Sequence, residues 1–140
     1  MQGSRRYAVR PIGRVRSSLV KRARAPKQGF EGAPDARVEV LPRFAEALQG
    51  IEAGQEVVVL TWLHEAERGV LKVHPRDDRR NPLTGVFATR SADRPNPVGL
   101  HRVRILMIGS GRWLEVRGLE AIDGTPVIDI KPVLNRSDDA

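Results

Sequence analysis

The sequence predicts a mainly β protein with a single domain: a small β-barrel, or a strongly curved sheet, that carries one short helix. Short apolar runs rich in β-branched residues recur along the chain, and glycine and proline residues separate them. Only one segment has apolar residues at helical spacing. The length of 140 residues suffices for one domain with a buried core. We expect this domain to span residues 1–140, with a loose tail over about residues 135–140.

The first third of the chain is expected to supply two strands and the helix. Residues 7–16 predict a strand that a proline and a glycine interrupt, and residues 20–37 predict a basic loop rich in the same two residue types. Residues 38–41 predict a second strand. Residues 42–51 begin with proline and then space their apolar side chains at helical intervals, which predicts the helix.

The remaining segments predict three or more further strands. Residues 56–63 form a nearly continuous apolar run, which is typical of a strand that is buried on both faces. Residues 74–85 are polar and rich in turn residues, so we expect a loop. Residues 100–108 and 113–122 predict a hairpin around the turn between them. Residues 127–130 predict a last strand after a tight turn.

The charge of the chain favours a polyanionic partner, most simply nucleic acid. Lysine and arginine together number 24 against 17 aspartate and glutamate residues, which gives a net charge of +7. Of the basic residues 20 are arginine, whose planar guanidinium binds phosphate or carboxylate through two hydrogen bonds. Codon usage in a GC-rich genome would also explain the ratio of arginine to lysine, but not the net charge.

Composition excludes several classes of protein. The chain has no cysteine, so it has neither disulfides nor thiolate zinc sites. No apolar run approaches the roughly 18 residues that span a membrane. The basic N-terminal segment resembles a transit peptide, but its alternating apolar residues fit a first strand equally well. We therefore expect a cytoplasmic protein without a membrane segment.

Motifs for common nucleotide, metal and hydrolase sites are missing from the sequence. It contains neither the glycine-rich dinucleotide fingerprint nor a phosphate-binding P-loop. His64, His74 and His101 lack the spacing of metal ligands, so we expect no metal site. No serine lies in a nucleophile elbow, which argues against a hydrolase of that type.

The segment "GVFATRSADRPNPVG", residues 85–99, is the first candidate site. Residues 86–88 are apolar and predict the end of a strand, whereas two prolines make the rest stiff and irregular. Its polar side chains are those of Arg90, Ser91, Arg94 and Asn96. Side chains on a stiff loop lose little entropy when they bind a ligand. Alternatively, the two arginines bond to neighbouring carbonyl groups and the prolines fix a corner of the barrel.

The segment "DGTPVIDIKP", residues 123–132, is the second candidate site. Asp123 and Gly124 predict a tight turn, where Thr125 and the backbone amides would bind the carboxylate or ribose of a ligand. An ordinary hairpin connection has the same sequence pattern. Asp129 follows on the strand, and the alternation of side chains points it away from the core.

These two segments together resemble the paired signature of the TrmO family of tRNA methyltransferases. The stretches "IGRVRSS" and "APKQG" resemble the family's first strand and the loop after it, so the resemblance covers about residues 8–133. It implies a β-barrel methyltransferase that uses S-adenosyl-L-methionine and works as a homodimer. The implied substrate is threonylcarbamoyladenosine beside the anticodon, methylated on its exocyclic adenine nitrogen, and the implied partner is therefore the tRNA anticodon stem-loop.

The resemblance also implies site residues, and we expect both signature segments to fold into one pocket. The implied cofactor-binding residues are Pro26, Lys27, Gln28, His64, Glu65, Arg90, Leu100, Asp123, Gly124, Thr125, Pro126 and Val127. The residues then left for the phosphates and the threonyl carboxylate of the tRNA are Arg94, Asn96 and Lys131. The acceptor nitrogen carries a proton that a carboxylate would accept. Asp129 is the first candidate for this catalytic role and Glu65 the second, although either would also serve as a structural partner of the arginines.

The chain departs from the family pattern at positions that keep other functions open. Glu65 stands where the family commonly has glutamine, and Val133 stands where a tyrosine often follows "DIKP". One alternative is a methyltransferase of the same fold that acts on another nucleoside or on a small molecule. The other alternative is a β-barrel that binds RNA without catalysis.

Overall fold

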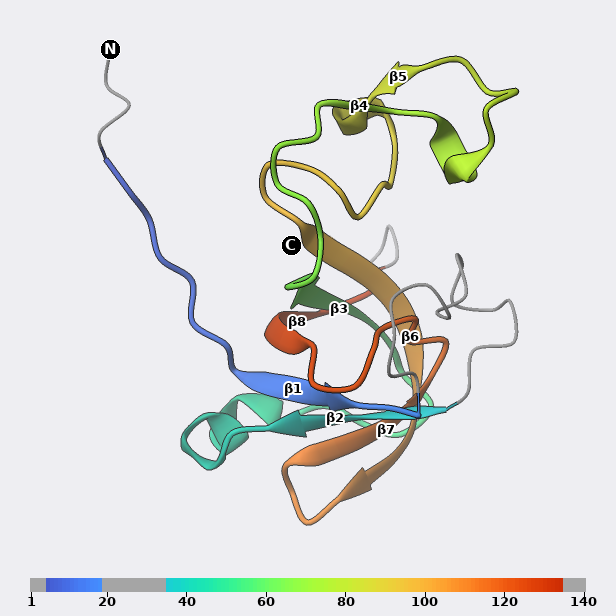
Figure 1. Cartoon of the computed structure of the whole chain (residues 1–140). Coiled ribbons are helices and arrows are strands. Elements are labelled where there is room, and N and C mark those ends of the chain that lie inside the picture. The colour runs from blue at the N-terminus through green and yellow to red at the C-terminus, as the bar shows by residue number, and fades with distance from the viewer. Residues whose placement is uncertain (1–4, 19–34, 135–140) are drawn as a thin grey trace.

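Six strands of the described residues close into a barrel, which confirms the predicted fold class (Figure 1). The computed structural model describes residues 5–18 and 35–134. Around the barrel the strands follow the order β1, β2, β7, β6, β3 and β8, and all neighbours are antiparallel. Their bounds are β1 Gly13–Arg16, β2 Ala36–Val40, β3 Glu56–Trp62, β6 Val98–Gly109, β7 Trp113–Arg117 and β8 Pro126–Pro132.

Alternate residues of these strands point inward and form a core made mostly of valine. Buried and more exposed residues alternate along β1, β2, β3 and β7. On β3 only Val57, Val59 and Thr61 are buried, so the prediction of a strand buried on both faces is wrong. The wall of a closed barrel has one face toward the core, and the apolar residues on the outer face of β3 are only half-buried.

The predicted helix is present at the expected place as a 3₁₀-helix, η2 (Pro42–Leu48). Proline stands at its start, as the sequence indicated. Phe44, Leu48 and Ile51 are partly buried and pack against the core of the barrel. The helical spacing in the sequence therefore reflects one apolar side that closes against the strands.

Strand β1 begins later than predicted, and its pairing with β2 requires a glycine at its first residue. A side chain at Gly13 would overlap the backbone carbonyl of Glu39, so only glycine allows this close approach. Pro11 precedes the strand and has no N–H group to donate. The chain before Gly13 is therefore not part of the sheet, although Ile12 still donates one hydrogen bond to the Val127 carbonyl.

The hairpin formed by β6 and β7 is confirmed, and β6 extends beyond the predicted bounds. It pairs with β3 along the whole of that strand. On the other side of β3, the register with β8 shifts by one residue between Leu60 and Thr61. As a result Val127 lies opposite Thr61 on the inner face, whereas Asp129 lies opposite Leu60 on the outer face.

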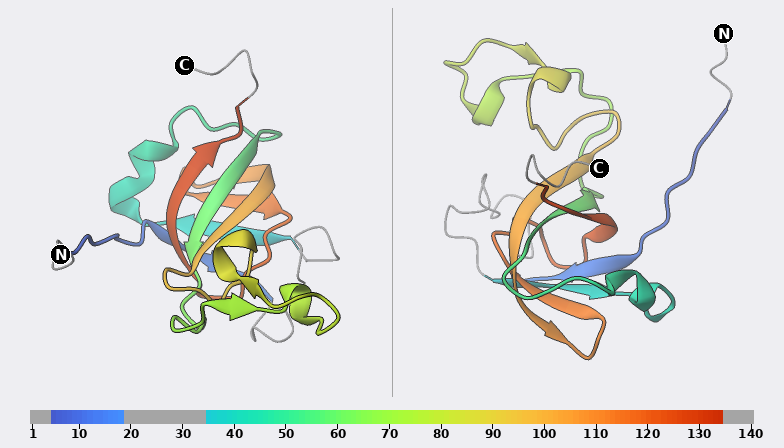
Figure 2. Two further views of the ribbon diagram at one scale, coloured as in Figure 1. Left: turned by 90° about the horizontal axis from the view of Figure 1, so that it is seen from above. Right: turned by 180° about the vertical axis from the view of Figure 1, so that it is seen from behind.

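Residues 63–97 leave the barrel between β3 and β6 and form an arm, which stands to one side of the barrel in both views of Figure 2. Its elements are β4 (Lys72–Val73), η3 (Pro75–Asp77), β5 (Thr84–Gly85) and η4 (Val86–Ala88), with β4 and β5 paired. The prediction that residues 86–88 end a strand is wrong, because the Thr89 amide donates to the Val86 carbonyl and closes a 3₁₀ turn. The loop predicted for residues 74–85 likewise contains η3 and β5.

Candidate functional site

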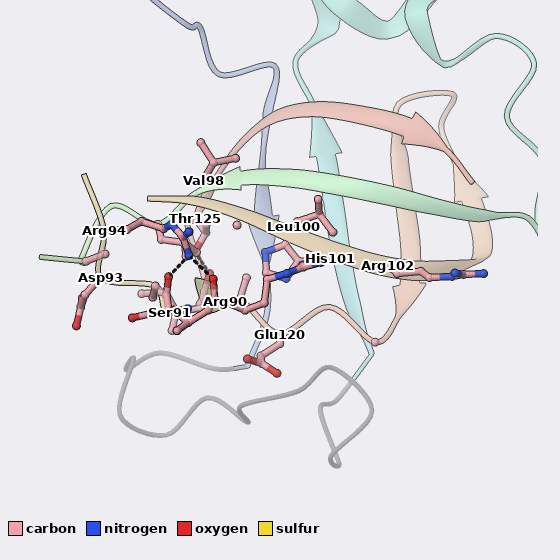
Figure 3. A pocket seen from close by; sticks show the side chains of 18 of the residues that line it. Arg90, Ser91, Asp93, Arg94, Val98, Leu100, His101, Arg102, Glu120 and Thr125 are labelled. Carbon is pink, nitrogen blue, oxygen red and sulfur yellow. Dashed lines mark hydrogen bonds between the residues drawn. The ribbon is translucent and has the colours of Figure 1, made fainter. Parts of the chain in front are cut away.

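An open cleft with a volume of about 1460 Å³ lies between the arm and the barrel (Figure 3). Its walls come from the arm, from β6 and from the segment between β7 and β8. Arg90 contributes from the first signature segment and Thr125 from the second. The two segments predicted to share one pocket therefore line the same cleft.

Arg94 holds the loop of the first signature segment together. Its guanidinium donates to the backbone carbonyls of Thr89 at 3.0 Å, Ser91 at 2.9 Å and Val86 at 2.9 Å. These contacts correspond to the alternative in which an arginine bonds to neighbouring carbonyls. Arg94 is partly buried, and its donors satisfy backbone groups that would otherwise lack partners. The structure thus gives Arg94 a role in the loop itself, and its contact with tRNA stays a prediction.

Arg90 lies four residues away in the same loop and has no partner among residues 5–18 and 35–134. Its side chain is exposed and lines the cleft, and no other described residue bonds to its guanidinium. The loop beneath it is fixed by Arg94 and by the Ser91 amide, which donates to the Thr89 hydroxyl at 3.1 Å. A free guanidinium on a fixed loop is suited to bind a carboxylate or phosphate.

His64, Glu65 and Leu100 are the other predicted cofactor-binding residues that line the cleft. His64 and Glu65 follow β3 at the start of the arm, where His64 Nε2 lies 3.8 Å from a Glu65 carboxylate oxygen. Both side chains are well exposed. Leu100 lies on β6, where it pairs with Leu60 on the outer face of the barrel and exposes half of its surface.

Most residues in the turn of the second signature segment bond to β1 or pack in the core of the barrel. Thr125 is buried at the cleft, and its hydroxyl donates to the Ile122 carbonyl at 2.7 Å. Asp123 accepts a hydrogen bond from the Ser17 amide at 3.0 Å, and the Gly124 amide donates to the Val15 carbonyl. Val127 belongs to the core. Of the five residues predicted here, including Pro126, only Thr125 lines the cleft; Gly124 and Pro126 line a second, smaller cavity.

The structure does not bring Asp129, Lys131 or Asn96 to the cleft. Asp129 lies on the outer face of β8, where its carboxylate is 3.0 Å from the Lys131 ammonium. Asn96 accepts a hydrogen bond from Arg68, which also donates to the Pro95 carbonyl. The first candidate for the catalytic carboxylate is therefore outside the cleft of this chain, and Glu65 is inside. The predicted contacts at Pro26, Lys27 and Gln28 lie outside the described residues.

His101 lines the cleft and is a functional candidate that the sequence patterns did not indicate. It points to the inner side of β6, and its Nε2 shares a hydrogen bond of 2.8 Å with the Thr61 hydroxyl. Burial lowers the pKa of His101 from 6.5 to about 4, so the ring is neutral at physiological pH. The alternation of inward residues along β6 is the signal in the sequence that places this histidine inside the barrel mouth.

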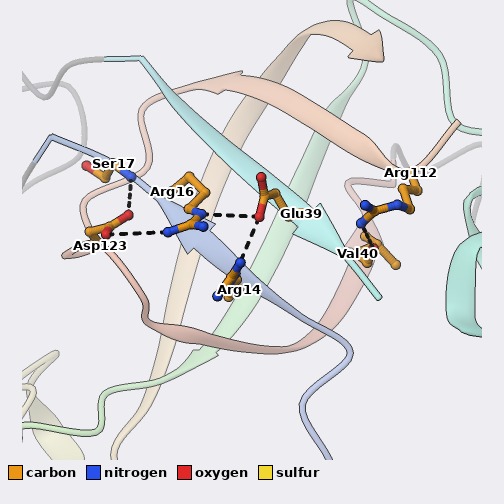
Figure 4. A network of polar contacts seen from close by, with 7 residues as sticks. All are labelled: Arg14, Arg16, Ser17, Glu39, Val40, Arg112 and Asp123. Carbon is orange, nitrogen blue, oxygen red and sulfur yellow. Dashed lines mark hydrogen bonds and ion pairs between the residues drawn. The ribbon is translucent and has the colours of Figure 1, made fainter. Parts of the chain in front are cut away.

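A separate network of ion pairs lies on the outside of β1 and β2 (Figure 4). Glu39 accepts hydrogen bonds from Arg14 at 3.3 Å and Arg16 at 3.2 Å, and Arg16 also lies 3.8 Å from Asp123. Burial acts to raise the pKa of Glu39, but the bonds from both arginines outweigh it and lower the pKa below its usual value. These arginines have partners within the chain.

The described residues contain neither a metal-binding cluster nor a helix that could span a membrane. In residues 5–18 and 35–134, no three histidine or acidic side chains come together as a metal site would require. Over the same part of the chain, no helix has the length and apolar character needed to cross a membrane.

Comparison with known proteins agrees with the signature segments. The family model described as "tRNA-methyltransferase O N-terminal domain" matches residues 14–139. A "probable S-adenosyl-L-methionine-binding protein" of Methanothermobacter thermautotrophicus is 48% identical over 124 residues, which cover 89% of this chain and 88% of that protein. A "putative S-adenosylmethionine-dependent methyltransferase RcsF" of Pseudomonas aeruginosa is 41% identical over 139 residues, covering 94% of this chain and 59% of that protein.

Solved structures show the same similarity in three dimensions. A crystal structure of TrmO from Pseudomonas aeruginosa superposes with a TM-score of 0.75 and 33% identity, and the match covers 100% of this chain. It covers 60% of the TrmO chain, so this chain spans about three fifths of the length of that relative.

Proposed function

This chain belongs to the TrmO family, and on that premise we propose that it is an S-adenosylmethionine-dependent methyltransferase that acts on tRNA. The family model matches most of the chain, and relatives that are 41–48% identical are named for S-adenosylmethionine binding or methyl transfer. The observation that carries the proposal is the cleft itself, because both signature segments line it and the exposed Arg90 has no partner there among the described residues.

The residues of the cleft fit the proposed cofactor. S-adenosylmethionine has a carboxylate, which the exposed guanidinium of Arg90 would bind. The volume of about 1460 Å³ exceeds the 300–1,000 Å³ that is typical of a single small-molecule site, so an acceptor nucleotide would fit beside the cofactor.

The roles of the residues follow from the chemistry of the reaction. The bound cofactor supplies a methyl group that its positively charged sulfur already activates. The chain therefore contributes mainly alignment, and Arg90 on its fixed loop provides an anchor for it. The acceptor nitrogen must lose a proton, and a carboxylate within reach would accept it. We assign this role to Glu65, which lines the cleft, rather than to Asp129, which is paired with Lys131 outside it.

We propose threonylcarbamoyladenosine beside the anticodon as the acceptor, with methylation of its exocyclic adenine nitrogen. The net charge of +7 supports binding of an anticodon stem-loop. We also propose that the protein forms a homodimer and is located in the cytoplasm. Exposed apolar side chains along β6, those of Val98, Leu100, Met107 and Ile108, support a partner subunit.

One observation favours a second acceptor. Val133, where family members often have tyrosine, donates its amide to the Glu56 carbonyl directly after β8 and offers no aromatic ring to an acceptor base. A methyltransferase for another nucleoside would tolerate this change. Mass spectrometry of tRNA nucleosides from a deletion strain separates the two acceptors. Loss of methylated threonylcarbamoyladenosine supports the first, and loss of a different methylated nucleoside supports the second.

Cofactor binding is tested by titration calorimetry with S-adenosylmethionine. We expect the protein to bind it and Arg90→Ala to weaken binding at least tenfold, because the carboxylate then loses a charge-assisted bond. Arg79→Ala is the matched control, since Arg79 is an exposed arginine of the arm that does not line the cleft. A protein that binds RNA but takes up no S-adenosylmethionine would instead be the non-catalytic barrel.

A further inference from the structure

His101 lies where the inner face of the barrel opens into the cleft (Figure 3). On β6 it follows Gly99 among the inward residues, and it pairs with Val59 of β3. Thr61, the next inward residue of β3, is completely buried, and the only described partner of its hydroxyl is His101 Nε2 at 2.8 Å. A buried hydroxyl without a partner is unfavourable, so Thr61 fixes the orientation of the ring.

Gly99 makes the room that this contact needs. A Cβ atom at position 99 would overlap the Thr61 hydroxyl, and it would lie 2.7 Å from His101 Nε2 and 3.1 Å from Leu63 Cδ2. No other residue type could stand there without moving both partners of the hydrogen bond. The last glycine of the first signature segment therefore has a defined task in this chain, which is to admit the pair of Thr61 and His101.

The other ring nitrogen, Nδ1, has no hydrogen-bond partner among the described residues. Among the described residues, the side-chain atoms that are buried without a hydrogen bond do not include Nδ1. Since Nδ1 has no partner there, it is not buried. Since His101 lines the cleft, Nδ1 is accessible from there. Polar atoms held at the base of a binding cleft are the groups that orient a ligand.

The neutral state of the ring determines what Nδ1 can bind. Burial keeps the pKa of His101 near 4, which leaves one ring nitrogen as donor and the other as acceptor. The Thr61 hydroxyl can rotate to donate or accept, so either tautomer satisfies it. Nδ1 can therefore adapt to a neutral polar group, such as a ribose hydroxyl or the edge of a base, and it carries no charge that would attract a carboxylate.

We infer that His101 is a ligand-binding residue whose Nδ1 hydrogen-bonds the nucleoside part of the cofactor, and that Thr61 is the positioning residue that fixes its ring. This inference rests on the proposed function, because the ligand concerned is S-adenosylmethionine or its product. It adds a contact from the inside of the barrel to the contacts that the resemblance places on the arm and the turn.

Two substitutions of His101 distinguish the role of Nδ1 from the role of Nε2. The amide of asparagine reaches about as far as Nδ1, and the amide of glutamine reaches about as far as Nε2. His101→Gln keeps the contact with Thr61 and loses the ligand contact, so we expect the Kd for S-adenosylhomocysteine to rise roughly tenfold. His101→Asn keeps the ligand contact, so we expect a Kd within about threefold of wild type and a lower Tm. Titration calorimetry and thermal unfolding measure both.

Variants of Thr61 test the positioning role. Thr61→Val removes the hydroxyl, and we expect the Kd for S-adenosylhomocysteine to rise about threefold to tenfold because the ring is no longer held. Thr61→Ser keeps the hydroxyl and should restore the wild-type Kd. Equal binding by the valine and serine variants would overturn the positioning role.

The ¹⁵N resonances of the His101 ring test the inference in the wild-type protein, without any substitution. With ¹⁵N-labelled histidine, addition of S-adenosylhomocysteine should shift the His101 Nδ1 resonance more than the Nε2 resonance. Unchanged His101 resonances at saturation, or wild-type affinity in a folded His101→Gln variant, would overturn the inference and leave the proposed function standing. Absence of binding by the wild-type protein would overturn both.

Discussion

The ion-pair network outside β1 and β2 and the cleft beside the arm use the same residue types in opposite ways. In the network, Arg14 and Arg16 both bond to Glu39, and Arg16 also approaches Asp123 (Figure 4). In the cleft, the Arg90 guanidinium has no partner among the described residues, and neither has Nδ1 of His101. The abundance of arginine therefore has at least two structural meanings in this chain.

Arg94 shows that position in the chain does not distinguish an arginine paired within the protein from one available to a ligand. It lies in the same loop as Arg90 and lines the same cleft, yet three backbone carbonyls occupy its guanidinium. By its contacts it belongs with the network, because its partners are part of the protein. Side chains without internal partners at a cleft are therefore the candidates for ligand binding, and the paired ones maintain the fold.

The largest effect is expected for Arg94→Ala. Three carbonyl groups of the loop would lose a charged donor, and we expect the free energy of unfolding to fall by about 3 to 4 kcal/mol. Arg94→Lys should recover little of it, because one ammonium group does not match the geometry of the guanidinium. Urea denaturation measures both. Wild-type stability of the alanine variant would place Arg94 with Arg90 among the ligand-binding residues and break the comparison.

The next effect is a pH dependence that His101 imposes on stability. Its pKa is about 4 in the folded chain against 6.5 ordinarily, so the unfolded chain binds more protons between these values. Stability should therefore fall by up to about 3 kcal/mol as the pH decreases from 6.5 to 4. His101→Gln removes the titrating group, and urea denaturation across this range should then show a flatter profile. An unchanged profile in the variant would assign the dependence to other groups.

A smaller effect is expected for Gly99→Ala. The added Cβ overlaps the hydroxyl of Thr61 and crowds His101, so we expect a loss of about 2 kcal/mol together with weaker binding of S-adenosylhomocysteine. Gly69→Ala is the control, since nothing lies within 4 Å of a Cβ there and the φ angle is not restrictive. Equal stability of the two variants, measured in urea, would show that the pair of Thr61 and His101 has room to move.

The smallest effect is expected in the network. Glu39→Gln weakens two ion pairs at the surface, and we expect a loss below about 1 kcal/mol. The folded-state pKa of Glu39 is lowered, so its contribution is present above pH 4.5 and is lost as the pH falls through the lower folded value. The variant should show a shallower loss of stability in acid. A steeper loss than in wild type would contradict the pairing of Glu39 with Arg14 and Arg16.

Much of the fold could be predicted from the sequence because it depends on local patterns. The alternation of apolar residues located the hairpin of β6 and β7, and the proline before an apolar spacing located η2. The burial of β3 could not be predicted, since a continuous apolar run looks alike in a barrel wall and in a sheet covered on both sides. The 3₁₀ turn at Val86–Ala88 depends on contacts with Arg94 that only the folded loop brings together.

The candidate site was predictable in part for a related reason. Sequence resemblance located Arg90, Leu100 and the pair of His64 and Glu65, all of which line the cleft. Alternation along the last strand correctly predicted that Asp129 points away from the core, but its place outside the cleft follows only from the pairing of β8 with β3. The contact of Thr61 with His101 joins residues 40 positions apart, and it follows only from the pairing of β3 with β6.

A crystal structure of the protein with S-adenosylhomocysteine would show whether the cleft beside the arm binds the cofactor. We predict the ligand in the cleft, with its carboxylate at Arg90 and a nucleoside atom within hydrogen-bond distance of His101 Nδ1. Density for the ligand on the outer face of β8 beside Asp129 and Lys131, with Arg90 and His101 untouched, would contradict it.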